Sequence, residues 1–320
     1  MSTPINDLPT FLGPDPDRFV SARAELAARI RAREPLVLPG VSDPLSARLA
    51  ERAGFKGCYA TGAGIANVQY GIPDIGLIGF DEVIAVVRRI TESVPLPLVV
   101  DADTGFGATL SVMRTVHLLE RAGAAAVQIE DQSMPKRCGH FGLHELVDTR
   151  EMVAKIRAAV AARADPNLLI IGRTDALGVL GIDEAIRRGH AYHEAGADVL
   201  FIEAPHSVRQ LEQIGSEFAG IPLVANVVEG GLTPQLSASE LSDLGFSIAL
   251  FANFLMRVMA KAGQSALEAL YASGDSRPFS ETMLSWVQRQ ELVGLEQFQA
   301  LEDYFESPVP DEALGQAAAE

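Results

Sequence analysis

Residues 109–130 read TLSVMRTVHLLERAGAAAVQIE and contain the pattern that decides the fold. Their first part, 109–122, carries apolar residues three and four positions apart, which predicts a helix with one buried face. Ala122 and Gly123 then end the helix, because glycine readily adopts the left-handed conformation found just after helix ends. The residues that follow are largely apolar up to a final Glu130, as in a strand buried on both faces. The segment therefore predicts a helix followed directly by a parallel strand.

The same succession of helix, small residue, glycine and strand recurs along the chain. The equivalent pairs are Ala53-Gly54, Ala195-Gly196 and, as a variant, Leu244-Gly245. Apolar runs that predict buried strands cover 35–41, 57–61, 96–101, 124–130, 168–173, 198–203, 221–226 and 247–252. Segments with helical periodicity lie between them, at 43–53, 81–93, 109–122, 149–162 and 182–195. This recurrence indicates a repeated βα unit.

Alternating units of this number favour an α/β fold of the (β/α)8 type, a TIM barrel. A doubly wound open sheet is the alternative, but it would place a glycine-rich fingerprint after its first strand, and residues 38–43 (LPGVSD) contain none. We expect residues 1–275 to form the barrel, including an N-terminal segment. A helical pattern continues to residue 306, so we expect a C-terminal helical extension at 276–306 and a flexible tail at 307–320.

Composition excludes several classes of protein. The 320 residues include 26 Lys and Arg against 42 Asp and Glu, a formal net charge of −16. A chain this acidic repels phosphate backbones and anionic lipids, so we expect no nucleic-acid or membrane partner. No apolar run is long enough to span a membrane, and residues 1–20 lack the pattern of a signal peptide. Two cysteines do not make a disulfide framework, which favours the cytoplasm.

Carboxylates gather at the predicted strand ends, where barrel enzymes place their catalytic groups. Asp101 and Asp103 lie two positions apart, so an extended chain points both the same way, and Glu130 ends the next strand. Such a group of acids repels itself unless a cation binds there, and carboxylate oxygens suit Mg²⁺ or Mn²⁺. The alternative is that these acids cap the following helices or pair with Arg173.

Residues 135–140 (PKRCGH) form a basic segment in an acidic chain, directly after the predicted acid group. A cysteine beside Lys, Arg and His has access to thiol and thiolate forms, so Cys138 suits a proton donor, a proton acceptor or a nucleophile. The alternative is a solvated loop with an incidental cysteine. Cys58, by contrast, lies inside a predicted strand, where a cysteine acts as a small buried apolar residue.

Five short motifs together resemble the isocitrate lyase and phosphoenolpyruvate mutase superfamily. They are 100–107 (VDADTGFG), 129–132 (IEDQ), 136–140 (KRCGH), 172–176 (GRTDA) and 201–204 (FIEA). The resemblance extends from about residue 36 to residue 305 and is most specific in KRCGH. It points to the lyase branch, which includes enzymes that cleave methylisocitrate and 2,3-dimethylmalate. It implies a barrel whose late helical region, here the C-terminal extension, is swapped between subunits, and a homotetramer.

The resemblance also implies roles for single residues. It makes Asp101 a direct Mg²⁺ ligand, with Asp103, Glu130 and Asp74 completing the metal site. It makes Cys138 the catalytic acid/base, with Arg173 and His140 as further catalytic residues. The residues that would bind a small hydroxy-carboxylate substrate are Thr61, Gly62, Ala63, Cys138, Gly139, Arg173, Glu203 and Asn226. Arg257 and Arg289 fall where tricarboxylate lyases keep arginines, although Arg289 also suits a helix surface.

Departures from the family pattern leave the substrate open. Residues 226–231 (NVVEGG) look like the alkylmalate-cleaving members, whereas 250–253 (LFAN) is similar to the mutase and hydrolase branch. The leading hypothesis is a Mg²⁺-dependent carbon–carbon lyase that acts on a 2-hydroxy di- or tricarboxylate and releases pyruvate or a related 2-oxo acid. The alternatives are an oxaloacetate decarboxylase or hydrolase, a phosphonopyruvate mutase or hydrolase, a phosphate-binding barrel that uses Gly230 and Gly231, and a non-catalytic scaffold.

Overall fold

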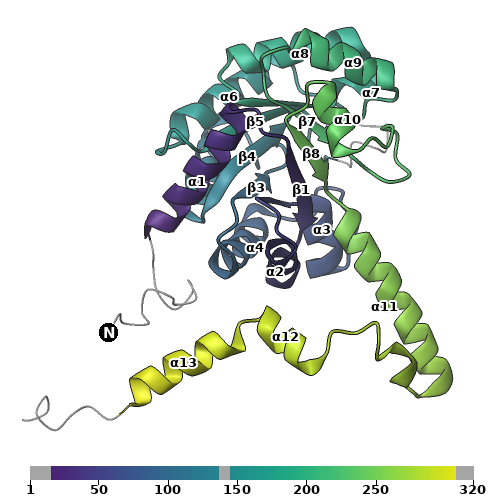
Figure 1. The fold of residues 1–320 in the computed structure, drawn as a ribbon. Coiled ribbons are helices and arrows are strands. Elements are labelled where there is room, and N and C mark those ends of the chain that lie inside the picture. Colours follow the sequence, from purple (N-terminus) through teal and green to yellow (C-terminus); the bar gives the residue numbers. More distant parts are fainter. Residues whose placement is uncertain (1–15, 137–144, 308–320) are drawn as a thin grey trace, which may run out of the picture.

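Eight parallel strands form a closed barrel (Figure 1). The computed structural model describes residues 16–136 and 145–307. The strands are β1 (Leu36–Val41), β2 (Cys58–Ala60), β3 (Leu98–Asp101), β4 (Ala124–Glu130), β5 (Leu169–Thr174), β6 (Val199–Ile202), β7 (Leu223–Asn226) and β8 (Ile248–Phe251). They follow each other around the barrel in chain order, and β8 pairs with β1 to close it. The predicted (β/α)8 barrel is therefore confirmed.

Helices surround the barrel and connect its strands. They are α1 (Pro16–Arg31), α2 (Pro44–Arg52), α3 (Gly62–Ile65), α4 (Phe80–Ser93), α5 (Thr109–Arg121), α6 (Thr149–Ala162), α7 (Ala176–Leu180), α8 (Ile182–Glu194), α9 (Val208–Glu217) and α10 (Ala238–Asp243). A short π-helical segment, η2 (Ala66–Tyr70), continues α3. Strand β4 and helix α6 have the predicted bounds, and the other predicted strands differ by one or two residues at their ends.

The recurrent glycines occupy the conformation for which they were singled out. Gly54, Gly123, Gly196 and Gly245 have φ values of 90°, 93°, 106° and 93°, in the left-handed region. Side chains other than glycine are strained there, so these positions end a helix and turn the chain into the next strand. The pattern quoted from the sequence therefore sets the repeat of the barrel.

The core has two layers. Side chains that point outward from the strands pack against the surrounding helices, and those that point inward fill the barrel. Helix α1, which the sequence analysis did not assign, contributes Leu26, Ala27 and Ile30 to the interior cluster. Ile30 lies four positions after Leu26 and three after Ala27, which is the spacing of one helix face and could have been recognised in the sequence.

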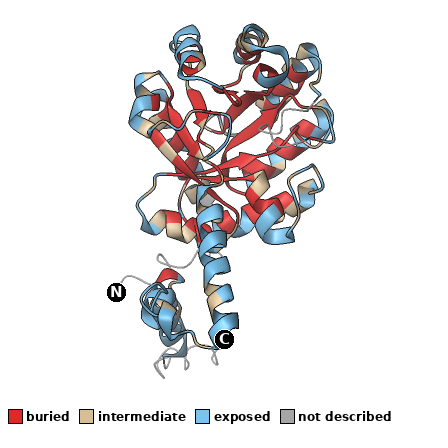
Figure 2. Cartoon of the chain, turned by 90° about the vertical axis from the view of Figure 1, so that its right-hand side faces the viewer, coloured by how far each residue is buried: buried red, intermediate tan, exposed pale blue. Residues whose placement is uncertain are grey.

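The C-terminal part extends away from the barrel (Figure 1). Helix α11 (Phe254–Ser273) continues from β8, and η4 (Arg277–Phe279), α12 (Trp286–Leu292) and α13 (Leu295–Glu306) follow. Figure 2 shows these helices almost wholly exposed, and α11 contains no buried residue. Arg48 on α2 donates to the Leu292 carbonyl, so α12 touches the barrel of its own chain. The domain boundary at residue 275 and the exchange of the C-terminal extension between subunits stay predictions. Of the predicted tail, 307–320, only residue 307 belongs to the described residues.

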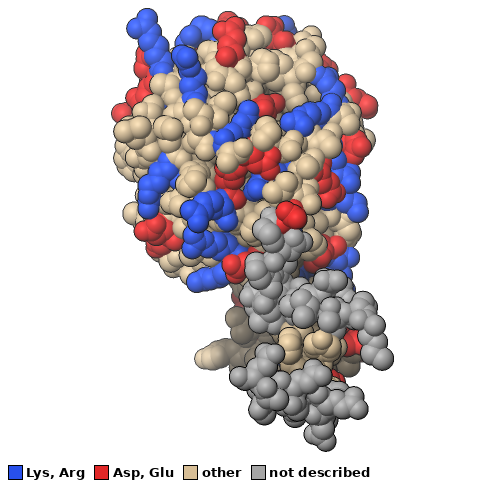
Figure 3. All heavy atoms as spheres, turned by 90° about the vertical axis from the view of Figure 1, so that its left-hand side faces the viewer, with Lys and Arg blue, Asp and Glu red and all other residues tan. Residues whose placement is uncertain are grey.

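The face of the molecule in Figure 3 carries charged side chains of both signs. Figure 3 shows Lys and Arg side chains interspersed with Asp and Glu, without a broad basic area. Over residues 16–136 and 145–307, no helix combines the length and the apolar character needed to cross a bilayer.

Cys58 lies in β2 and is fully buried, as its strand position predicted. Burial, with a smaller contribution from Glu51, raises the pKa of its thiol to about 12. Because the thiolate is the reactive form, we expect Cys58 to resist alkylation in the folded protein. Mass spectrometry after brief iodoacetamide treatment should find one labelled cysteine in the native chain and two after denaturation. Native labelling of Cys58 would contradict this.

Candidate active site

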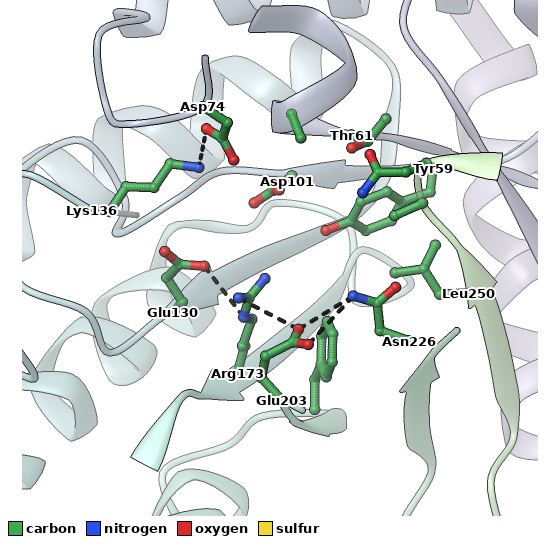
Figure 4. Close-up of a pocket in the computed structure, with 14 residues that line it drawn as sticks. Tyr59, Thr61, Asp74, Asp101, Glu130, Lys136, Arg173, Glu203, Asn226 and Leu250 are labelled. Carbon is green, nitrogen blue, oxygen red and sulfur yellow. Dashed lines mark hydrogen bonds and ion pairs between the residues drawn. The ribbon is translucent and has the colours of Figure 1, made fainter. Parts of the chain in front are cut away.

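A pocket opens at the carboxyl ends of the strands (Figure 4). It brings together eight residues that the sequence analysis had assigned to the site: Thr61, Ala63, Asp74, Asp101, Glu130, Arg173, Glu203 and Asn226. It also contains six that it had not: Tyr59, Lys136, Phe201, Leu250, Ala252 and Asn253. Two of these could have been found from the sequence: Lys136 belongs to the KRCGH motif, and Asn253 follows a strand end.

An acidic corner of the pocket is closed by a lysine. Lys136 Nζ lies 2.6 Å from Asp74 Oδ1 and 2.7 Å from Asp103 Oδ1, and its side chain is almost completely buried. Asp101 accepts a hydrogen bond from the Gly62 N–H at 3.3 Å. A Cβ on Gly62 would lie 3.1 Å from Asp101 Oδ2, so glycine allows the α3 backbone to approach this carboxylate. The predicted acids therefore converge, with an ammonium group already among them.

Burial and repulsion by neighbouring carboxylates raise the pKa values of Asp103 and Glu130. The pKa of Asp103 is raised to about 6, chiefly by burial and also by Asp101, against the opposing effect of Lys136. The pKa of Glu130 is raised by burial, with contributions from Asp175 and Asp101. Although burial would lower the pKa of Lys136, the surrounding acids raise it. The corner thus carries more negative charge than one lysine neutralises, and it favours binding of a further cation.

The donor atoms of this corner suit a hard divalent cation. Every candidate ligand is a carboxylate oxygen, and Glu130 Oε1 is buried without a hydrogen-bond partner. Within the described residues, no three acidic, histidine or cysteine side chains converge tightly enough to enclose a metal by themselves. Mg²⁺ usually takes one or two carboxylates and keeps several water ligands, so this arrangement fits it.

Arg173 lines the pocket between Glu130 and Glu203 and is held by three acids (Figure 4). Its guanidinium binds Asp175 at 2.9 and 3.0 Å, and lies 3.3 Å from Glu130 Oε2 and 3.4 Å from Glu203 Oε2. Asn226 Nδ2 in turn donates to Glu203 at 3.4 Å. A guanidinium fixed in this way is preorganised to stabilise negative charge on a bound carboxylate.

Asp131, which the sequence analysis did not single out, organises the region behind Arg173. Its carboxylate accepts hydrogen bonds from Thr174 Oγ1 at 2.7 Å, the Asp175 N–H at 2.9 Å, Arg188 Nη1 at 2.9 Å and Tyr192 Oη at 2.6 Å. It is completely buried. The backbone of Asp175, whose side chain clamps Arg173, is thereby tied to β4 and α8.

We expect Asp131→Asn to destabilise the protein by about 3 kcal/mol, because it removes the fully buried one of the two carboxylates that pair with the Arg188 guanidinium. The other, Glu184 at 2.9 Å, is more exposed and stays in place. Turnover should also fall, since the Asp175 clamp loses its anchor. Tyr192→Phe is the matched control: it removes one of the four hydrogen bonds and should cost about 1–2 kcal/mol. Urea unfolding followed by circular dichroism measures both changes. Equal stability of Asp131→Asn and the wild type would contradict the role of this carboxylate.

The structure does not bring all predicted residues to the pocket. Arg257 Nη1 binds the Glu229 carbonyl at 2.6 Å, outside the pocket lining. Arg289 lies on α12 with its guanidinium carbon 4.0 Å from the ring centroid of Trp286. Cys138, Gly139 and His140 lie outside the described residues, so their predicted roles remain predictions.

Similarity to known proteins agrees with this geometry. The family model described as phosphoenolpyruvate phosphomutase matches residues 26–271. The chain is 40% identical to 2,3-dimethylmalate lyase of Eubacterium barkeri, over 88% of this chain and 98% of that protein. It is 37% identical to 2-methylisocitrate lyase of Vibrio cholerae, over 89% and 93% of the two chains.

A solved structure of oxaloacetate acetylhydrolase, in complex with 3,3-difluorooxalacetate, superposes with a TM-score of 0.85. It shares 33% sequence identity with this chain and the match covers 89% of this chain and 97% of that one. The family model, the two lyase relatives and this structure all match the length of chain that builds the barrel and its pocket. On this agreement, the chain belongs to the phosphoenolpyruvate mutase/isocitrate lyase superfamily.

Proposed function

We propose that this protein is a Mg²⁺-dependent carbon–carbon lyase that cleaves a 2-hydroxy di- or tricarboxylate and releases pyruvate or a related 2-oxo acid. The observation that carries the proposal is that an acidic corner and the preorganised Arg173 guanidinium lie in the same pocket. Both lyase relatives support the reaction class. We further propose that the protein acts in the cytoplasm, as its two cysteines suggest.

The metal site would be formed by Asp101, with Asp103, Glu130 and Asp74 as ligands or as acceptors for metal-bound water. Mg²⁺, or Mn²⁺ in its place, would make the 2-hydroxyl of the substrate more acidic. For an incoming cation to reach Asp74 and Asp103, Lys136 must give up at least part of its two ion pairs with them. The chain itself thus supplies a cation that balances the acids until the metal site is filled.

The proposed reaction conserves every atom of the substrate. The hydroxyl proton leaves to a base of the site, the C2–C3 bond breaks, and its electron pair moves to C3, so that C2 becomes the carbonyl carbon of the 2-oxo acid. The Ala63 backbone N–H and the Arg173 guanidinium would stabilise the negative charge on the carboxylates. The N–H groups of Thr61 and Gly62 donate to the Val41 carbonyl and to Asp101, so they would have to be released before they could contribute. Cys138 then donates a proton to C3, with His140 and Gly139 beside it. No water, oxidant or second substrate is consumed.

A product assay tests the proposal. The purified protein is incubated with Mg²⁺ and, separately, with alkylmalates, isocitrate, methylisocitrate, oxaloacetate and phosphonopyruvate, and the products are identified by mass. We expect a 2-oxo acid and a carboxylic acid from one of the hydroxy acids. Oxalate or carbon dioxide from oxaloacetate would favour the hydrolase or decarboxylase alternative, which the oxaloacetate acetylhydrolase structure keeps open. Phosphoenolpyruvate formed from phosphonopyruvate would favour the mutase alternative, and phosphate released from it would favour the hydrolase alternative.

We also propose that the chain assembles as a homotetramer in which residues 276–306 are exchanged between subunits. The described C-terminal helices expose large apolar side chains: Leu267 and Tyr271 on α11, Trp286 and Val287 on α12, and Phe305 on α13. Monomers rarely expose apolar surface of this extent.

Sedimentation equilibrium should therefore give a mass well above the 34.1 kDa of one chain. Truncation after residue 275 should lower the number of chains per particle, because it removes α12 and α13 while leaving the barrel strands intact. A full-length chain that sediments as a monomer at micromolar concentration would contradict the assembly.

A further inference from the structure

The pocket has two sides of different chemistry. Asp74, Asp101 and Lys136 lie on one side, whereas Asn226 and Leu250 lie on the other (Figure 4). The second side, at the ends of β7 and β8, is completed by Ala252 and Asn253 and carries no charged group of its own. It therefore offers amide and apolar contacts to whatever part of a substrate extends away from the acidic corner.

The cations of the described pocket lining are already committed to acids. They are Lys136 and Arg173. Lys136 is paired with Asp74 and Asp103, and Arg173 is shared among three acids. A substrate with two carboxylates and a hydroxyl would place these groups at the metal site and at Arg173. They would take up the positive charge that the acids of the pocket do not already balance. A third carboxylate would have to lie where no described cation is free to meet it.

The neutral side borders the Glu203 carboxylate, which opposes a further anion. Glu203 Oε1 and Oε2 lie 3.4 and 3.5 Å from Asn226 Nδ2, so the amide hydrogens of Asn226 already point to a carboxylate. The Oδ1 atoms of Asn226 and Asn253 are buried without hydrogen-bond partners. Unpartnered acceptors next to a glutamate favour a hydrogen-bond donor and repel a carboxylate. Leu250 and Ala252 beside them offer the apolar contact that suits a small alkyl group.

The two arginines that could serve a third carboxylate are bound elsewhere. Arg257 lies on α11, with its guanidinium on the Glu229 carbonyl and 3.4 Å from the Glu229 carboxylate. Arg289 is stacked on Trp286 in the C-terminal helices. Neither belongs to the lining of the pocket. The position that the sequence resemblance gave to Arg257 therefore does not place its charge in the pocket of this chain.

From these contacts we infer that the pocket selects a dicarboxylate with a small alkyl group on C3, and discriminates against a tricarboxylate with a carboxymethyl group there. This deepens the proposed lyase function and rests on it. Two substrates form a matched pair: 2,3-dimethylmalate and 2-methylisocitrate share the 2-hydroxyl, both remaining carboxylates and the C2 methyl. They differ only at C3, which carries a methyl group in the first and a carboxymethyl group in the second.

The test is the ratio of kcat/KM for these two acids with saturating Mg²⁺. An uncompensated buried charge is costly, so we expect kcat/KM to be about 100-fold higher for the dimethylmalate. A ratio near one, or a preference for methylisocitrate, overturns the inference. Arg257→Gln and Arg289→Gln are expected to leave the ratio unchanged. A selective loss of methylisocitrate cleavage in either variant would also overturn it.

A gain of charge provides the converse test. Asn253→Lys places an ammonium group on the neutral side, and should shift the ratio toward methylisocitrate by about tenfold or more. Asn253→Gln keeps the amide and is the matched control, for which we expect no such shift. If Asn253→Lys fails to fold, the wild-type ratio still decides the question.

Equilibrium binding separates this inference from the proposed reaction. Calorimetry with Mg²⁺ and the Cys138→Ser variant measures the affinity for each acid without turnover. Tighter binding of dimethylmalate, with no cleavage of either acid by the wild type, would support the selectivity and refute the lyase function. Cleavage of both acids with tighter binding of methylisocitrate would support the lyase function and refute the selectivity.

Discussion

Replacement of Cys138 by serine should lower the rate of carbon–carbon cleavage by about 10²–10⁴-fold, the usual contribution of a general acid. Serine is nearly the same size as cysteine, but its hydroxyl is a far weaker acid, so the carbanion at C3 would not be protonated. Binding of Mg²⁺ and of the hydroxy acid should remain close to that of the wild type. Steady-state kinetics and calorimetry on the same preparation measure the two effects separately.

Cys58→Ser is the matched control for this variant. The Cys58 side chain is fully buried in β2, so a hydroxyl there should cost about 1–3 kcal/mol of stability and little turnover. Alkylation of the native protein should inactivate it through Cys138, and substrate with Mg²⁺ should protect. Near-normal turnover by Cys138→Ser on the true substrate would count against the lyase mechanism. It would move the protein toward the hydrolase or decarboxylase alternative, which needs no such acid.

Asp101→Asn should reduce turnover by about 10³-fold, because a metal that activates the substrate hydroxyl contributes several kcal/mol. The fold should survive at a small cost in stability. Asp101 accepts from the Gly62 N–H at Oδ2 and from the Asp103 N–H at Oδ1, and the single oxygen of asparagine can keep one of these two hydrogen bonds. Excess chelator should abolish wild-type activity, and added Mg²⁺ should restore it. Calorimetric titration with Mg²⁺ gives a measure of binding that does not depend on activity.

Asp81→Asn is the corresponding control, because Asp81 is an exposed acid in the first turn of α4. It should change neither Mg²⁺ binding nor turnover, as exposed charges contribute little. Full wild-type activity in excess chelator, or unchanged Mg²⁺ affinity in Asp101→Asn, would refute the metal site at this corner.

Lys136 illustrates where prediction from the sequence stopped. Its place in KRCGH indicated a basic segment near the acids, but spacing along the chain does not say which acid an ammonium group will reach. Asp74 and Asp103 are 62 and 33 residues away from it in the numbering, and only the closure of the barrel brings all three together. The same holds for Asp131, whose partners come from β5 and α8.

The sequence by itself determined the barrel and the identity of most site residues. Apolar runs and left-handed glycines are local signals, and in a parallel barrel every strand end lies on the same face, so Asp101, Glu130, Arg173 and Glu203 had to meet there. Only the tertiary structure decided which charges are paired and which remain for a substrate. Arg257 lies six residues after the end of β8, just as Lys136 lies six residues after the end of β4, yet its guanidinium binds Glu229 outside the pocket. The direction of a long side chain depends on the neighbours that the fold supplies, and a linear pattern does not contain them.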